Sequence, residues 1–161
     1  MKAELTVDYH IKTAWHAISR MYNLYAARYD LTMATGYVLL NVDKNGTPAT
    51  KIAPLLGLEP RSLTRMLKTL EEEKGWIRRE ANGGDKRIVN VYLTEEGKRK
   101  RDQAREAVLM FNTMVRQEVS EDRLEAFFET MGAISRVIER ETSNGRQYAP
   151  DPLLNEPEAW T

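Results

Sequence analysis

The sequence predicts a mostly α-helical protein with one small β-hairpin. Apolar residues recur every three or four positions over most of the chain, which is the spacing of helices that bury one face. Near the middle, two short runs rich in β-branched and aromatic residues flank the loop "ANGGDK" at 81–86. The length of 161 residues suits one domain, or one domain with an added oligomerisation arm.

Composition narrows the class of protein. The chain has no cysteine, which removes disulfides, Cys-type zinc sites and thiol redox switches. Its start lacks the apolar core of a signal peptide, and no apolar run approaches the ~20 residues of a membrane span. We therefore expect a cytoplasmic protein with no membrane partner.

Charge is distributed unevenly along a chain whose net charge is zero. Residues 51–101 hold 13 Lys or Arg against 8 Asp or Glu, whereas residues 102–161 hold 6 against 12. A basic middle favours an anionic partner for that region, although the zero total argues mildly against a DNA-binding domain. Chance fluctuation explains the uneven distribution equally well.

The first third of the chain predicts two helices and a turn. Residues 9–29 carry apolar side chains in steps of three and four, which indicates a long helix. Residues 32–42 predict a second helix, with Thr32 as its cap. The stretch "DKNGTP" at 43–48 contains the Asn-Gly pair that is typical of a turn.

The next segment predicts a helix-turn-helix. Residues 49–56 suit a short helix that Gly57 ends, and residues 61–73 suit a second helix that follows Pro60 and ends at Gly75. The turn "GLE" joins the two helices. The second helix has an apolar stripe at positions i, i+3, i+4 and i+7, which consists of Leu63, Met66, Leu67 and Leu70.

A β-hairpin and two long helices complete the chain. The runs "WIRRE" at 76–80 and "RIVNVYL" at 87–93 predict the two strands, and a hairpin directly behind a helix-turn-helix is a winged helix. Thr94 and Ser120 are the expected caps of two long C-terminal helices, the second with a nearly heptad apolar stripe. From residue 143 onward the composition becomes polar and proline-rich.

This order of elements resembles the MarR family of bacterial transcription regulators over roughly residues 8–142. The resemblance is most specific in the wing, where Asp85, Lys86 and Arg87 form the family's Asp-x-Arg pattern before a strand and the sequence "LTEEG". It implies a winged helix-turn-helix DNA-binding domain at 31–97, an N-terminal dimerisation helix at 1–30 and C-terminal dimerisation helices at 98–142. The tail at 143–161 lies outside the family pattern.

The outward face of the helix at 61–73 is the predicted reader of DNA. Arginine and lysine hydrogen-bond guanine, and hydroxyl groups reach bases or phosphates. We assign base contacts to Ser62, Thr64 and Arg65 and phosphate contacts to Arg61 and Lys68. Thr69 and Arg78 complete the expected interface. The alternative for any isolated helix is an ordinary solvated face.

The single acid in the basic wing loop needs a local explanation. Residues i and i+2 of a hairpin share a face, so Asp85 can pair with Arg87 and direct its guanidinium. A pre-aimed arginine enters the narrow minor groove at lower entropic cost, and the family uses this pair in the same way. Lys86 adds a phosphate contact. The alternative is a surface ion pair worth well under ~1 kcal/mol that stiffens the turn.

The first helix and the two long C-terminal helices carry more apolar surface than one small domain needs, which predicts a homodimer and hence a pseudo-palindromic DNA site. In the family, small aromatic ligands often bind between the dimerisation helices and the winged helix. The candidates for such a pocket are aromatic and Met side chains at helical spacing, although such residues more often fill a plain core. They are Trp15, Tyr22, Tyr25, Tyr29 and Met33.

No enzymatic motif stands out, and we expect neither a cofactor nor a metal. His10 and His16 are six positions apart and point to different sides of one helix. The sequence therefore predicts a dimeric regulator that binds double-stranded DNA as a repressor and responds to a small aromatic effector. A winged helix that serves as a protein–protein interaction module is the alternative, since the net charge is zero.

Overall fold

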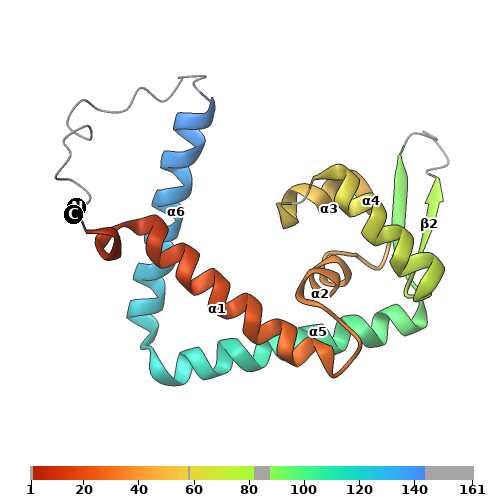
Figure 1. Cartoon of the computed structure of the whole chain (residues 1–161), viewed down its shortest axis with the longest axis horizontal. Coiled ribbons are helices and arrows are strands. Elements are labelled where there is room, and N and C mark those ends of the chain that lie inside the picture. Colours follow the sequence, from red (N-terminus) through yellow and green to blue (C-terminus); the bar gives the residue numbers. More distant parts are fainter. Residues whose placement is uncertain (1, 58, 82–87, 144–161) are drawn as a thin grey trace. The chain divides into compact units, whose positions relative to one another are not determined.

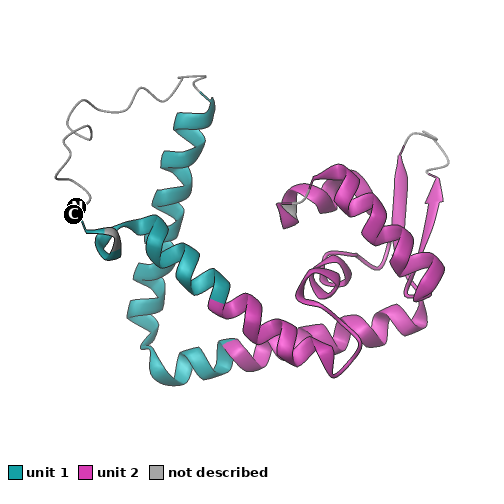
Figure 2. Ribbon diagram, viewed as in Figure 1, with its two compact units in different colours: residues 1–16, 112–161 teal, residues 17–111 magenta. Residues whose placement is uncertain are grey.

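The computed structural model describes residues 2–57, 59–81 and 88–143 (Figure 1). The chain divides into two compact units, and each is described by itself (Figure 2). One unit is residues 17–111, and the other combines residues 1–16 and 112–161. In chain order the elements are η1 (Ala3–Leu5), α1 (Val7–Ala27), α2 (Met33–Leu40), β1 (Thr47–Pro48), α3 (Ala49–Leu56), α4 (Pro60–Lys68), η2 (Thr69–Glu73), β2 (Ile77–Ala81), β3 (Val89–Leu93), α5 (Glu95–Glu118) and α6 (Glu121–Ser143).

A small antiparallel sheet with the strand order β1-β3-β2 forms the base of the wing. β2 pairs with β3 from Ile77 opposite Leu93 to Ala81 opposite Val89, which confirms the predicted hairpin strands. The predicted turn over 43–48 is wrong in its last two residues, because β1 pairs there with β3. A strand of two residues is too short to show an alternating pattern, so its residues carry no recognisable strand signal.

The core of residues 17–111 lies beneath the helix-turn-helix and the sheet. Leu63, Leu67 and Leu70 are at most 3% exposed, and they cluster with Ile77 and Val91 of the strands. This confirms the predicted inward stripe, in which Met66 is partly buried. Burial of each such side chain contributes about 1.5–3 kcal/mol, so the stripe fixes which face of α4 points outward.

The ends of the helices follow the expected local chemistry. Thr32 forms a capping box with Thr35 at the start of α2. Gly57 adopts the left-handed conformation after α3, with a φ of 59°, and Pro60 occupies the first turn of α4. Thr94 Oγ1 accepts a hydrogen bond from the Gly97 backbone nitrogen at 3.1 Å, as a cap of α5 should.

The helix that is predicted to read DNA, called the recognition helix, differs from the prediction in its last turn. The sequence predicts one regular helix over 61–73, but the α-helical hydrogen bonds end at Lys68 and η2 continues as a π-helical turn. The Lys74 backbone nitrogen donates to the Thr69 carbonyl at 3.1 Å, which is an i to i+5 bond. A single widened turn leaves the spacing of the apolar stripe unchanged up to Leu70, so the periodicity did not reveal it.

The second unit contains the start of α1, the end of α5 and α6, drawn in teal in Figure 2. Arg116 of α5 pairs with Glu121 at the corner where α6 begins. α6 buries Leu124 but leaves Phe127 and Phe128 each 54% exposed. The tail from residue 144 lies outside the described residues. Among the helices that are described, none combines the length and the apolarity that crossing a bilayer requires.

Candidate nucleic-acid interface

α4 turns a polar and basic face to solvent because its opposite face is buried. The predicted DNA-reading residues of this helix are all exposed, and Thr69, the first residue of η2, is half-buried. Figure 1 shows α4 beside α3, with β2 near its far end, as in a winged helix. The exposed set comprises Arg61, Ser62, Thr64, Arg65 and Lys68.

These side chains differ in how free they are to bind DNA. Thr64 Oγ1 donates to the Pro60 carbonyl at 2.9 Å, so its hydroxyl hydrogen is used inside the helix. Lys68 Nζ lies 3.7 Å from a carboxylate oxygen of Glu72. Within the part of the chain that the structure describes, no hydrogen bond or ion pair engages the guanidinium groups of Arg61 and Arg65. Arg61 and Arg65 are therefore the uncommitted arginines of α4, which means that no described side chain or backbone group pairs with them.

The base of the wing holds Arg78 in a defined place. Its guanidinium carbon lies 4.5 Å from the centre of the Tyr92 ring on the opposite strand, and it also pairs with Glu80. Gly46 packs under the same ring, where a Cβ would overlap its atoms. Asp85, Lys86 and Arg87 lie outside the described residues, so their contacts stay predictions.

An ion pair that the sequence analysis missed joins the recognition helix to the wing. Glu71 Oε1 accepts a hydrogen bond from the Arg79 backbone nitrogen at 2.7 Å, and Glu71 Oε2 accepts one from Arg79 Nε at 2.6 Å. Three consecutive glutamates at the end of a helix were the available signal, because the helix dipole disfavours acids there. For Glu71, the two hydrogen bonds from Arg79 offset this cost.

The basic run at 98–101 is largely engaged by neighbouring groups. Lys98 Nζ lies 2.5 Å from Glu95, and this contact lowers the pKa of the Glu95 carboxyl. Lys100 Nζ donates to the Tyr29 carbonyl at 2.7 Å, and the remaining two arginines pair with acids on α5. The run therefore presents less free positive charge than its sequence suggests.

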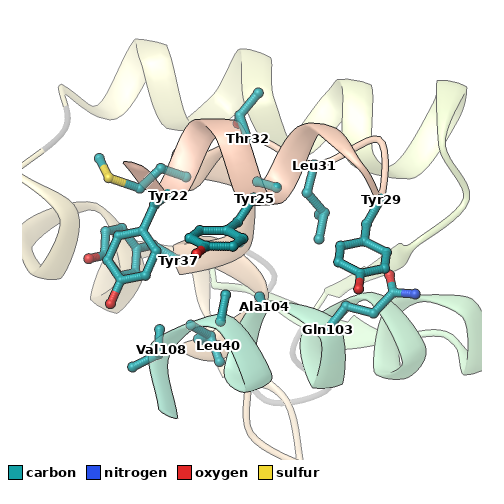
Figure 3. A pocket seen from close by; sticks show the side chains of 14 residues that line it. Tyr22, Tyr25, Tyr29, Leu31, Thr32, Tyr37, Leu40, Gln103, Ala104 and Val108 are labelled. Carbon is teal, nitrogen blue, oxygen red and sulfur yellow. The ribbon is translucent and has the colours of Figure 1, made fainter. Parts of the chain in front are cut away.

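A small apolar pocket lies between α1, α2 and α5 within residues 17–111 (Figure 3). The rings of Tyr22, Tyr25 and Tyr29 reach from α1 and the turn after it toward α5. The free volume is about 30 Å³, and none of the lining residues is charged. The lining residues are Tyr22, Tyr25, Ala26, Tyr29, Leu31, Thr32, Met33, Gly36, Tyr37, Leu40, Gln103, Ala104, Ala107 and Val108.

The lining of the pocket is uncharged, and one lining residue, Gln103, carries an unsatisfied polar atom. Burial raises the pKa of the Tyr22 hydroxyl, to which the neighbouring Tyr37 adds, and burial also raises the pKa of the Tyr37 hydroxyl. Tyr22 packs edge-on against the rings of Tyr37 and Phe111. Among the described residues, the Gln103 Oε1 atom is buried without a hydrogen-bond partner.

The structure brings four of the five candidate ligand residues together and leaves one out. Tyr22, Tyr25, Tyr29 and Met33 line the pocket, whereas Trp15 does not. Trp15 lies two helical turns before Tyr22, about 10 Å along the axis, although it shares the same helical face. The described residues also contain no group of three His, Cys, Asp or Glu side chains placed to hold a metal ion.

The order of elements and the exposed basic helix define a winged helix-turn-helix protein. Residues 31–89 match the model of the MarR family. The chain is 34% identical over 89 residues to the HTH-type transcriptional regulator TtmR of Methylorubrum extorquens strain PA1. This match covers 55% of the chain and 45% of TtmR, so the chain spans less than half the length of that relative.

Two solved regulators share the fold over most of their length. The DNA complex of MepR from S. aureus superposes with a TM-score of 0.75 at 19% identity, covering 83% of this chain and 99% of MepR. CouR bound to a 23-mer DNA duplex gives 0.71 at 26% identity, covering 81% and 92%. CouR from Rhodococcus jostii RHA1 bound to p-coumaroyl-CoA gives 0.73 at 20% identity, covering 82% and 93%. The comparisons thus show similarity to the MarR family over residues 31–89 and a fold shared with MepR and CouR.

Proposed function

We propose that this protein is a sequence-specific DNA-binding transcriptional regulator that acts as a repressor. The observation that carries the proposal is the pair of uncommitted arginines, Arg61 and Arg65, on the exposed face of the recognition helix. An arginine on such a helix can donate two hydrogen bonds to the O6 and N7 atoms of guanine. The DNA complexes of MepR and CouR and the name of TtmR support the same function.

A protein–protein interaction module is the competing function. Such a module would dock an acidic partner on the same basic face. An acidic partner would also pair with exposed arginines, but the N-terminal part of a recognition helix is the part that usually meets base edges. Arg61 lies in the first turn of α4, and Arg65 lies in its last turn. The placement of Arg61 therefore favours DNA as the partner.

The apolar surface of the unit formed by residues 1–16 and 112–161 supports a homodimer. Four large apolar side chains of α6 are 48–57% exposed, namely Phe127, Phe128, Val137 and Ile138. Trp15 of α1 is 48% exposed. Large exposed apolar side chains gathered on one helix mark an association surface. A two-fold dimer presents two recognition helices, so its operator is pseudo-palindromic.

The tyrosine-lined pocket supports a small effector that is neutral and aromatic. An ionised group would lose its hydration in a pocket whose lining carries no opposite charge. The Gln103 Oε1 atom offers one acceptor for a hydroxyl group of the ligand. A free volume of about 30 Å³ holds a water molecule or two, so a ring enters only when the tyrosines move. CouR, which shares this fold, is bound to p-coumaroyl-CoA in one solved structure.

Fluorescence anisotropy with the DNA upstream of the protein's own gene tests the DNA-binding function. We expect saturable binding that weakens as salt rises, because the arginines release counterions from phosphates. Random duplex DNA of equal length is the control, and it should bind more weakly at every salt concentration. Binding that is absent at low salt would favour the interaction module.

Thermal melting tests the effector with two probes of similar size. Phenol should raise the melting temperature, because it is neutral and can donate to Gln103 Oε1. Benzoate, which is ionised at pH 7, should not raise it. Stabilisation by benzoate alone would contradict a neutral ligand.

A further inference from the structure

The three glutamates at the end of the recognition helix have different surroundings. Glu72 pairs with Lys68 at 3.7 Å, and both side chains are more than half exposed. Glu73 accepts a hydrogen bond from the Thr69 hydroxyl at 3.3 Å. Glu71 is the exception, because its side chain is 27% exposed and both of its carboxylate oxygens bind Arg79.

The position of β2 explains why this carboxylate matters. The strand order β1-β3-β2 makes β2 an edge strand, so the backbone groups on its outer side have no neighbouring strand. Glu71 Oε1 satisfies one of them, the Arg79 nitrogen, at 2.7 Å. Glu71, at the end of the recognition helix, therefore provides β2 with a hydrogen-bond acceptor, as a neighbouring strand would.

The π-helical turn places Glu71 for this contact. In an α-helix each residue advances by 100°, and the extra residue of a π turn shifts the following positions by about that angle. η2 ends at Glu73, Gly75 then adopts the left-handed conformation with a φ of 64°, and Trp76 leads into β2. The turn and the carboxylate together join α4 to β2 within a few residues.

We propose that Glu71 is a positioning residue that fixes the wing relative to the recognition helix. This role rests on the proposed DNA-binding function, because its benefit appears when α4 and the wing engage one duplex together. A wing that is already held in place loses less conformational freedom on binding than one that swings. The bonds from a carboxylate to a backbone nitrogen and to a guanidinium are both charge-assisted, which makes them strong enough for this purpose.

Three matched substitutions test the proposal: Glu71→Gln, Glu72→Gln and Glu73→Gln. Each removes one negative charge from the same helix end near the DNA, so a purely electrostatic effect tightens binding in all three. We expect Glu72→Gln and Glu73→Gln to bind operator DNA as tightly as the wild type or more tightly. Glu71→Gln should weaken operator binding about ten-fold, while its binding to random DNA does not fall.

The ratio of operator to random-DNA affinity separates positioning from loss of fold. A merely unfolded fraction lowers both affinities equally and leaves this ratio unchanged. Arg79→Lys keeps the charge and the backbone bond but loses the Nε bond, so we expect a smaller drop in the same ratio. An unchanged ratio in both Glu71→Gln and Arg79→Lys would overturn the proposal.

Hydrogen exchange tests, without DNA, whether the contact of Glu71 with Arg79 holds β2 in place. The Arg79 amide should exchange faster in Glu71→Gln than in the wild type or in Glu72→Gln, because its acceptor becomes a weaker neutral amide. Equal exchange rates in the three proteins would show that Glu71 does not hold the strand. If the wild type fails to bind operator DNA, the proposed function fails, whereas the exchange rates still decide whether Glu71 holds β2.

Discussion

At the scale of single residues, a cation contributes more to DNA binding when no neighbouring carboxylate already pairs with it. Arg65 and Lys68 both lie on the exposed face of α4, but among the described residues only Lys68 has a carboxylate beside it. The sequence predicted that both side chains point outward, since the apolar stripe fixes the face. It did not predict which cations are already paired, because pairing depends on rotamers and on residues such as Glu71 and Arg79 that meet only after folding.

Arg65→Ala should weaken operator binding by about 1–3 kcal/mol and relax sequence preference, because a bidentate base contact is lost. Lys68→Ala should cost less and affect all sequences alike, since Lys68 gives up Glu72 when it meets a phosphate. Anisotropy titrations on operator and random DNA measure both effects. Equal losses on both DNAs for Arg65→Ala would place Arg65 on a phosphate instead of a base.

The partly buried Tyr37 predicts a pH dependence of stability at alkaline pH. Burial raises the pKa of Tyr37 above its ordinary value near 10. Just above pH 10 the unfolded chain therefore loses this proton while the folded protein keeps it, so the free energy of unfolding falls as pH rises through that window. Denaturant melts of Tyr37→Phe should show a smaller fall than the wild type. A fall of equal size in both proteins would remove Tyr37 as a cause.

At the scale of elements, long periodic segments were predictable and short ones were not. The helices, the hairpin and the caps Thr32 and Thr94 follow from apolar spacing and capping chemistry. The two-residue strand β1 and the π turn η2 depend on tertiary partners, namely β3 and Arg79. Local sequence carries little information about such elements, since packing outweighs propensity over so few residues.

Two glycines in helices predict opposite effects of the same substitution. A Cβ at Gly97 would overlap the Trp76 carbonyl oxygen, so Gly97→Ala should destabilise by about 1–3 kcal/mol. At Gly132 of α6 the nearest atom is the flexible Arg136 Nη1 at 3.5 Å, so Gly132→Ala should stabilise by about 0.5–1 kcal/mol. Urea unfolding measures both changes. Similar stabilities for the two variants would show that the approach of Trp76 to α5 is not tight.

At the scale of the whole molecule, the proposed function requires two copies of the chain. Phe128 is 54% exposed on α6, and we place it in the dimer interface. Phe128→Asp would bury an unpaired charge there, at a cost of several kcal/mol, and should yield monomers. Light scattering measures the mass, and circular dichroism checks that the monomer keeps its helices. A wild-type protein that is itself a monomer at micromolar concentration would contradict the homodimer.

Selection of binding sites from a pool of random duplexes tests whether a dimer of this chain reads a specific DNA sequence. We expect enrichment of one pseudo-palindrome whose half-sites lie about 10–10.5 base pairs apart, centre to centre. The double variant Arg61→Ala, Arg65→Ala should enrich no common sequence. A wild-type selection that returns no shared motif, although the protein is folded and dimeric, would show that the dimer does not read a specific sequence.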